Sequence, residues 1–188
     1  MAKAYLADDQ VSTFLVTPKN VGFEEQVGDS RVFRDLEYAF CLQHIKSGYK
    51  ILDIGASQPW FLLELIDRGC KVTTMDINPD AMSLHRKLGI DCVEANLVDI
   101  PFPDDSFSMV LCISTIEHVH NDEDIRGMKE IHRVSPRAII IVPFGKADNW
   151  EPHDPKRERT YDEYLLEKRI LPKWKVSRKA KIAVWDRN

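Results

Sequence analysis

Short apolar runs recur along the middle of the chain, and a polar stretch separates each run from the next. Five such runs, each of four to six residues, cover 50–54, 71–75, 90–93, 108–113 and 137–142. The last three are rich in valine and isoleucine, which favour strands. Short, nearly continuous apolar runs between polar segments are typical of strands buried on both faces of a sheet. The pattern therefore predicts five buried strands between residues 50 and 142.

The intervening segments 60–67, 79–88 and 122–132 carry apolar residues at helical spacing. Asn78 followed by Pro79 is a helix-start signal, because asparagine caps helices and proline fits the first helical position. Strands that alternate with helices at this spacing are typical of a parallel sheet covered on both faces. We therefore expect an α/β fold with a doubly wound, mostly parallel sheet of about seven strands.

The flanking segments extend this picture at both ends. Residues 31–46 read as a helix that packs over the sheet, and residues 143–159 as a long polar loop. A helix is expected over 161–170, and two apolar stretches, 174–176 and 182–185, are expected to complete the sheet. We therefore expect one domain over 1–188, with an N-terminal helical cap (1–49), a core (50–145) and a C-terminal loop, helix and strands (146–188).

Composition supports a single folded domain. The chain has 188 residues, of which 44% are apolar and 30% charged, and its formal net charge is −4. Its longest uninterrupted apolar runs, such as Ala138 to Val142, are far shorter than the ~20 residues of a membrane-spanning helix. Asp8 and Asp9 interrupt any apolar core of a secretion signal. The four cysteines lack paired spacing, so neither a metal site nor a disulfide framework is indicated. We expect a soluble, cytoplasmic protein with no membrane partner.

Charge is distributed unevenly along the chain. Residues 168–188 hold eight lysines and arginines against one acid, a net charge of +7, so the other 167 residues sum to −11. A basic segment can bind nucleic acid, but lysines on a solvated edge strand are the favoured interpretation. Between Lys87 and Arg126 there are nine acids and no lysine or arginine. That segment should repel phosphates and tolerate a cation.

The chemistry-bearing residues follow the first two strands of the predicted core. The first strand ends in Asp53-Ile54-Gly55, and the second ends at Asp76, 21 positions after Gly55. In an open α/β sheet, ligands bind beyond the carboxyl ends of the strands, and an acid at the position of Asp76 suits the hydroxyls of a ribose. The sequence therefore predicts a cofactor that contains adenosine.

The first turn argues against a dinucleotide. A pyrophosphate site needs further glycines, but Ser57 and Trp60 occupy those positions, and the charge of Asp53 would oppose the phosphates. S-Adenosylmethionine carries no phosphate, and its ammonium group suits an acid such as Asp53. A nicotinamide dehydrogenase is therefore the least favoured function.

Five collinear segments between about residues 37 and 165 resemble motifs of the class I S-adenosylmethionine-dependent methyltransferases. They are Ile51-Leu52-Asp53-Ile54-Gly55-Ala56, Thr74-Met75-Asp76-Ile77-Asn78-Pro79, the stretch from Val93 to Phe107, Ile116-Glu117-His118-Val119, and the stretch from Glu130 to Pro136. The resemblance implies a Rossmann-like fold, methyl transfer from S-adenosylmethionine, and a small-molecule or sugar-containing acceptor. It places the cofactor against Asp53, Gly55, Ala56, Ser57, Asp76, Ile77, Asn96, Leu97, Ile113 and Ser114.

The chain departs from the family pattern at several of these positions. Only Gly55 remains of the three glycines common in the first loop, and Asn96 stands where an acid usually holds the adenine amino group. The carbonyl oxygen of asparagine can accept the same hydrogen bond. These departures keep open an alternative function, a non-catalytic scaffold that retains the fold. A second alternative is a nucleic-acid or protein methyltransferase that uses the basic C-terminal segment.

His118 is the first candidate for a general base, because it follows the fourth core strand and a neutral imidazole titrates in the useful range. A structural histidine is an equal alternative. Glu117 is either an acid on the ligand side or a helix-start residue, while His120 and His153 are expected in solvated loops. Trp150 in the long loop is a further candidate for contact with the acceptor.

Overall fold

The computed structural model describes residues 3–4, 14–18, 30–144 and 159–170. Seven strands form one sheet in the order β1-β2-β7-β6-β3-β4-β5. All neighbouring strands are parallel except β1 and β2, which pair antiparallel. The predicted doubly wound α/β fold is therefore confirmed.

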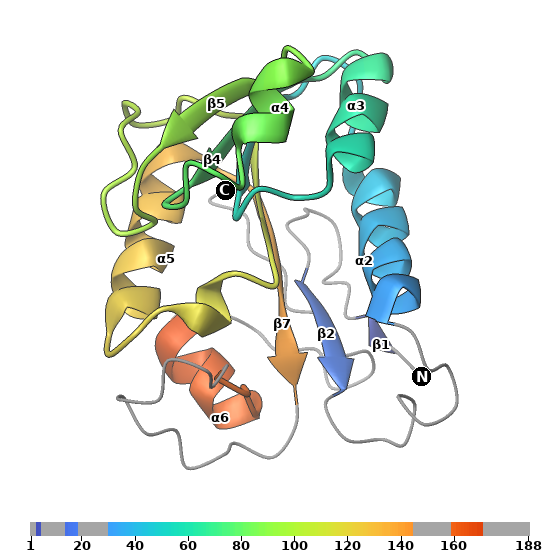
Figure 1. The fold of residues 1–188 in the computed structure, drawn as a ribbon. Coiled ribbons are helices and arrows are strands. Elements are labelled where there is room, and N and C mark those ends of the chain that lie inside the picture. Colours follow the sequence, from blue (N-terminus) through green and yellow to red (C-terminus); the bar gives the residue numbers. More distant parts are fainter. Residues whose placement is uncertain (1–2, 5–13, 19–29, 145–158, 171–188) are drawn as a thin grey trace.

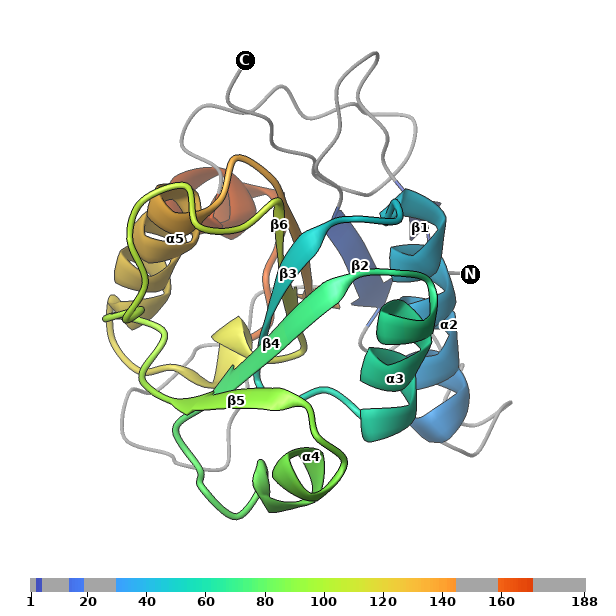
Figure 2. The same ribbon diagram turned by 90° about the horizontal axis from the view of Figure 1, so that it is seen from above.

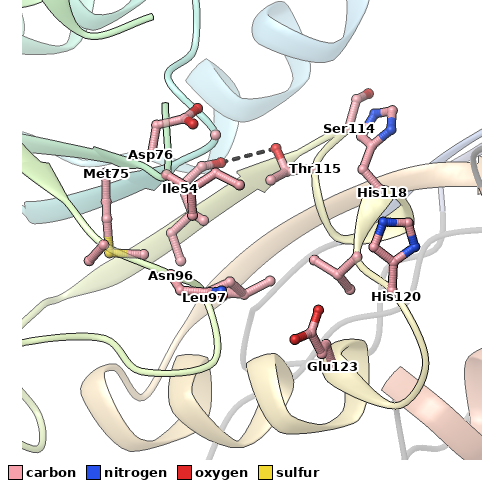
Figure 3. A pocket seen from close by; sticks show the side chains of 14 residues that line it. Ile54, Met75, Asp76, Asn96, Leu97, Ser114, Thr115, His118, His120 and Glu123 are labelled. Carbon is pink, nitrogen blue, oxygen red and sulfur yellow. Dashed lines mark hydrogen bonds between the residues drawn. The ribbon is translucent and has the colours of Figure 1, made fainter. Parts of the chain in front are cut away.

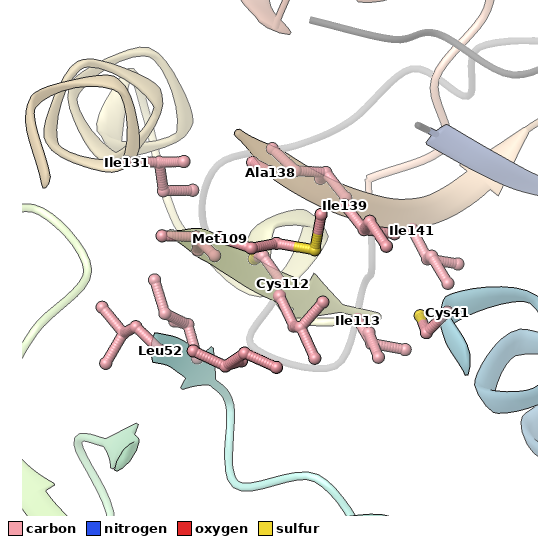
Figure 4. Close-up of a cluster of buried hydrophobic side chains, with 14 of the residues drawn as sticks. Cys41, Leu52, Met109, Cys112, Ile113, Ile131, Ala138, Ile139 and Ile141 are labelled. Atoms are coloured by element: carbon pink, nitrogen blue, oxygen red, sulfur yellow. The ribbon is translucent and has the colours of Figure 1, made fainter. Parts of the chain in front are cut away.

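The five predicted core strands all form. They are β3 (Lys50–Ile54), β4 (Lys71–Asp76), β5 (Asp91–Glu94), β6 (Met109–Ile113) and β7 (Ala138–Phe144). Residues 51–54 of β3 and every residue of β6 are buried, as expected for the centre of a parallel sheet. In Figure 4 the side chains of β6 lie between Ile131 on one side of the sheet and Cys41 on the other.

Helices cover both faces of the sheet (Figures 1 and 2). On one face lie α2 (Ser30–His44) and α3 (Pro59–Asp67), and on the other lies α5 (Glu123–Val134). Pro59 occupies the first turn of α3, where its missing N–H costs nothing, and Phe61, Leu62 and Leu65 form the buried face. The short helices are η1 (Ile116–His118), α6 (Glu163–Leu165) and η2 (Leu166–Ile170).

The helix predicted from Pro79 starts later than expected. Helix α4 covers only Ser83–Lys87, so the prediction that Asn78 caps a helix beginning at Pro79 is wrong. The side chain of Asp76 accepts a hydrogen bond from the Asn78 N–H, and the side chain of Asn78 accepts one from the Asp80 N–H. Such local side-chain bonds stabilise turns in competition with a helix. The helix predicted over 161–170 forms as two shorter pieces, α6 and the π-helical turn η2.

The N-terminal segment is not only a helical cap. Strands β1 (Lys3–Ala4) and β2 (Phe14–Pro18) extend the sheet beyond β7. The predicted terminal strands 174–176 and 182–185, the loop residues Trp150 and His153, and most of the basic segment lie outside the described residues. No helix among the described residues has the length and apolar character needed to cross a bilayer.

Candidate active site

A pocket of about 350 Å³ opens at the carboxyl ends of the central strands. Strand β3 has β4 on one side and β6 on the other, so the strand order reverses at β3. Ligands of open α/β sheets bind at such a switch point. Figure 3 shows the converging side chains. The pocket is lined by Ile54, Gly55, Met75, Asp76, Ile77, Ala95, Asn96, Leu97, Ser114, Thr115, His118, Val119, His120 and Glu123.

Seven of the eleven predicted site residues line this pocket together: Gly55, Asp76, Ile77, Asn96, Leu97, Ser114 and His118. Asp53, Ala56, Ser57 and Ile113 are outside the lining set. Six further lining residues were not predicted as site residues: Ile54, Met75, Ala95, Thr115, Val119 and Glu123. His118 and Val119 belong to one quoted motif, so extending that motif a few residues would have reached Glu123, whereas nothing in the pattern singles out Thr115.

The turn after β3 is tightly packed. Gly55 has φ of +98°, which favours glycine, and its N–H donates to the Met75 carbonyl oxygen at 2.8 Å. A Cβ atom at Gly55 would lie 2.0 Å from Oγ1 of Thr115. That hydroxyl bonds the carbonyl oxygens of Ile54 (3.2 Å) and Ile113 (3.0 Å), which ties the ends of β3 and β6 together. Glycine is therefore required here by both conformation and space.

Two residues other than glycine in this region also have positive φ, Ala56 at 43° and Ser114 at 48°. Non-glycine residues in this region carry backbone strain of about 1–3 kcal/mol each, and such strain collects at functional sites. Both residues follow strands that meet at the switch point. Ser114 therefore brings such strain into the pocket lining, and Ala56 lies next to the lining residue Gly55.

Asp53 lies behind the pocket rather than in it. It is fully buried, and its carboxylate accepts hydrogen bonds from the Ser57 N–H (2.9 Å), the Ser57 hydroxyl (2.6 Å) and the Thr74 hydroxyl (2.9 Å). Burial raises the pKa of Asp53, while these hydrogen bonds oppose that shift. Asp53 therefore shapes the turn that carries Gly55, and Ser57 does the same from the other end.

The α2 helix supports the same turn. The hydroxyl of Tyr38 accepts a hydrogen bond from the Gln58 N–H at 3.0 Å, and its ring stacks on Phe61 with centroids 4.2 Å apart. Trp60 is 49% exposed, packs edge-on against Tyr38 and is not a lining residue of the pocket. The start of α3 is therefore fixed by aromatic packing.

The carboxyl ends of β4 and β5 supply one wall. Asp76 is partly exposed, and its Oδ1 accepts the Asn78 N–H at 2.8 Å. Ile77 follows with 67% of its surface exposed. Oδ1 of Asn96 accepts a hydrogen bond from the Val98 N–H at 3.1 Å. The amide oxygen that is expected to accept a hydrogen bond from the adenine amino group therefore also stabilises the turn at residues 96–98.

The segment after β6 supplies the opposite wall. His118, at the end of η1, and His120 are both exposed and line the pocket with Glu123, the first residue of α5 (Figure 3). Glu117 is 1% exposed and is not a lining residue, which fits the helix-start interpretation rather than an acid facing the ligand. No described lining residue is lysine or arginine, whereas Asp76 and Glu123 are acids. The pocket therefore suits a cation.

Comparison with known proteins shows what the core is similar to. Residues 52–142 match the family model described as a methyltransferase domain. A demethylmenaquinone methyltransferase from Chlorobaculum tepidum is 37% identical over 109 residues, which cover 56% of this chain and 41% of that protein. The chain spans about half the length of the curated relatives it matches. These matches confirm the resemblance predicted from the motifs.

Solved structures share the fold. The PH0226 protein from Pyrococcus horikoshii OT3 superposes with a TM-score of 0.63 at 18% identity, over 83% of this chain and 90% of that one. The 1,6-didemethyltoxoflavin-N1-methyltransferase of Burkholderia thailandensis, solved with 1,6-didemethyltoxoflavin and S-adenosylhomocysteine bound, gives 0.60 at 17% identity, over 98% and 100%. The fold thus extends well beyond the segment matched by the family model.

Proposed function

We propose that this chain, whose residues 52–142 are a domain of the class I S-adenosylmethionine-dependent methyltransferase family, transfers a methyl group from S-adenosylmethionine to a small-molecule acceptor. The observation that carries the proposal is the pocket at the β3–β6 switch point, which joins seven of the predicted site residues in one cavity. When bound, the cofactor supplies an electrophilic methyl group on a sulfonium.

The residues present fit this cofactor. The Asp76 carboxylate at the end of β4 suits the ribose hydroxyls, and the apolar Ile77 and Leu97 suit the faces of an adenine ring. Two acids and no described lysine or arginine in the lining favour a sulfonium over a pyrophosphate. The Asp53–Ser57 hydrogen bonds hold the first turn without the missing glycines, which supports cofactor binding over the scaffold alternative.

Thermal unfolding with S-adenosylmethionine, S-adenosylhomocysteine and NAD tests the proposal. A ligand at 100 times its Kd adds ~2.7 kcal/mol, or roughly 5–10 °C in Tm for a domain of this size. We expect a shift with both sulfur ligands and none with NAD. No shift with any ligand would instead favour a scaffold that only keeps the fold.

Asp76→Ala should weaken binding of S-adenosylhomocysteine about 100-fold, or ~2.7 kcal/mol, because one charged acceptor serves two hydroxyls. Calorimetric titration measures the change. Asp91→Ala is the matched control, since Asp91 is exposed at the opposite end of the neighbouring strand β5. Equal affinities of wild type and Asp76→Ala would remove the ribose assignment.

For the acceptor, we propose an aromatic molecule with an ionisable hydroxyl, such as a hydroquinone. Relatives of the chain include a demethylmenaquinone methyltransferase, and the wall opposite the ribose site carries the imidazoles of His118 and His120. A neutral imidazole can take the proton that such an acceptor loses as it is methylated. An exposed position on the pocket wall leaves His118 accessible to an acceptor.

His118→Ala should lower kcat about 100-fold with a soluble naphthohydroquinone, since general-base catalysis contributes about 10²–10⁴-fold. The affinity for S-adenosylhomocysteine should stay the same, because His118 lies on the wall opposite Asp76. His132→Ala, a change of the same side chain on the α5 helix outside the pocket lining, is the control. Wild-type turnover in His118→Ala would make His118 a structural residue.

A further inference from the structure

An ion-pair cluster lies at each end of helix α5. The cluster of Arg133 is bonded to the loop that leads into one wall of the pocket, and the cluster of Asp124 with Arg159 and Arg169 is bonded to the segment that forms the opposite wall. We propose that Arg133 is the positioning residue of the cofactor wall (residues 95–97) and that Arg169 is the positioning residue of the acceptor wall (residues 118–123). The assignment of the walls to cofactor and acceptor rests on the proposed function.

The Arg133 cluster joins α5 to the loop that follows β5. Arg133 forms a two-point ion pair with Glu130, with N···O distances of 2.9 and 2.6 Å. Its guanidinium also donates to the carbonyl oxygens of Phe102 (2.7 Å) and Ile100 (2.8 Å), and Glu130 accepts the Ile100 N–H at 2.9 Å. These contacts with Arg133 hold the pKa of Glu130 below its ordinary value.

This loop continues directly into the cofactor wall. The Asp99 N–H donates to the Asn96 carbonyl oxygen at 3.0 Å, so the fixed backbone at Ile100 is one turn away from the lining residues Asn96 and Leu97. Leu97 also packs closely against Gly127 of α5. A Cβ atom at position 127 would lie only 2.6 Å from Cγ of Leu97. Loss of the Arg133 cluster should therefore release the wall on which the adenine is proposed to lie.

The Arg169 cluster lies at the beginning of α5, where η2 packs against the helix. Asp124 is fully buried and forms ion pairs with Arg159 and with Arg169, the latter with N···O distances of 2.7 Å to each carboxylate oxygen. Tyr161 donates to the same carboxylate at 3.1 Å. Arg169 also bonds the Asn121 carbonyl oxygen (2.8 Å) and the exposed Asp122 (2.9 Å).

These bonds attach the acceptor wall to residues 159–170 on both sides of His118 and His120. Before the wall, the Arg159 N–H donates to the Glu117 carbonyl oxygen at 2.9 Å. Within and after it, the Asn121 carbonyl oxygen and the Asp124 carboxylate bind the two guanidinium groups. The backbone of His118 and His120 is therefore held between two points of attachment to residues 159–170. Neither arginine lines the pocket, so both act through the backbone.

The two clusters share one helix but no residue, so their effects should be separable. Arg169→Gln and Arg133→Gln are matched variants, because both remove a guanidinium whose side chain is 20% and 30% exposed, respectively. Hydrogen exchange read by mass spectrometry, together with calorimetric titration of S-adenosylhomocysteine, gives one readout for each wall.

We expect Arg169→Gln to raise amide exchange over residues 116–124 while residues 96–107 stay as in the wild type, and Arg133→Gln to do the reverse. Arg133→Gln should raise the Kd of S-adenosylhomocysteine about 5–10-fold, whereas Arg169→Gln should change it less than about two-fold. Exchange that rises over both segments in either variant, or in neither segment, overturns the proposal, and so do equal losses of affinity. If a glutamine variant does not fold, Arg169→Lys and Arg133→Lys are compared in the same way, since lysine keeps the charge but loses the two-point geometry.

The exchange readout separates failure of this inference from failure of the proposed function. If the wild type binds no S-adenosylhomocysteine, the proposed cofactor is wrong, and the exchange pattern alone still decides whether each arginine positions its own wall. If the wild type binds the ligand and the exchange changes are not separated, only the positioning roles are wrong.

Discussion

Gly55→Ala should destabilise the protein by about 3–5 kcal/mol and abolish measurable binding of S-adenosylhomocysteine. An alanine at φ of +98° carries backbone strain, and its Cβ atom would meet Oγ1 of Thr115 at 2.0 Å. Moving Thr115 breaks its hydrogen bonds to Ile54 and Ile113, which share the one hydroxyl proton and together contribute about 1 kcal/mol. Those bonds hold the two strand ends between which the pocket opens, so stability and binding should fall together. Chemical denaturation and calorimetric titration measure the two effects.

Gly48→Ala separates the strain from the steric clash. Gly48 has a similar φ of +82°, but a Cβ atom there would meet nothing within 4 Å. We expect this control to cost about 1–2 kcal/mol and to leave the affinity for S-adenosylhomocysteine unchanged. If Gly55→Ala is no worse than Gly48→Ala in either measurement, the packing of Thr115 against Gly55 does not matter for the site.

Asp124→Ala should destabilise the protein by about 3–5 kcal/mol, because it leaves buried guanidinium charge without its carboxylate. Asp124 is 0% exposed, and its partner Arg159 has a side chain that is only 4% exposed. The alanine variant also removes the acceptor for the hydroxyl of Tyr161, a residue that is itself fully buried. Equilibrium denaturation in urea measures the loss.

Asp122→Ala is the matched control for Asp124→Ala. Both aspartates pair with the same nitrogen of Arg169, at 2.9 and 2.7 Å, but the side chain of Asp122 is 78% exposed. An exposed pair of this kind contributes about 0–1 kcal/mol. A similar loss in both variants would mean that burial does not set the strength of this cluster.

The order of strands and helices in the core could be predicted from the sequence because it depends on local patterns. The apolar runs 50–54 and 108–113 contain the central strands β3 and β6, and Asp76 is the last residue of β4, as predicted. The errors arose where side chains competed with the backbone. At Asn78, the side chains of Asp76 and Asn78 accept backbone N–H hydrogen bonds that stabilise a turn in place of a helix beginning at Pro79.

The role of an individual site residue depended on burial, which spacing does not encode. Asp53 and Asp76 both lie at the carboxyl ends of neighbouring strands, as the penultimate residue of β3 and the last residue of β4. Asp53 is nevertheless enclosed by Ser57 and Thr74, whereas Asp76 lines the pocket. His120 stands in a loop, as expected, but that loop forms a wall of the pocket.

By itself, the sequence determined the α/β fold, the resemblance of the core to methyltransferases and seven of the residues that line the pocket, because periodicity, turn residues and motifs are properties of neighbouring positions. Only the tertiary structure placed Thr115 in the space beside Gly55 and gathered Asp124, Arg159 and Arg169 into one buried cluster. These groups lie up to 60 positions apart in the chain, and their contacts arise only when the helices and strands pack. A buried charge shows no periodicity, because its partner is chosen by three-dimensional proximity and by the cost of removing both groups from water.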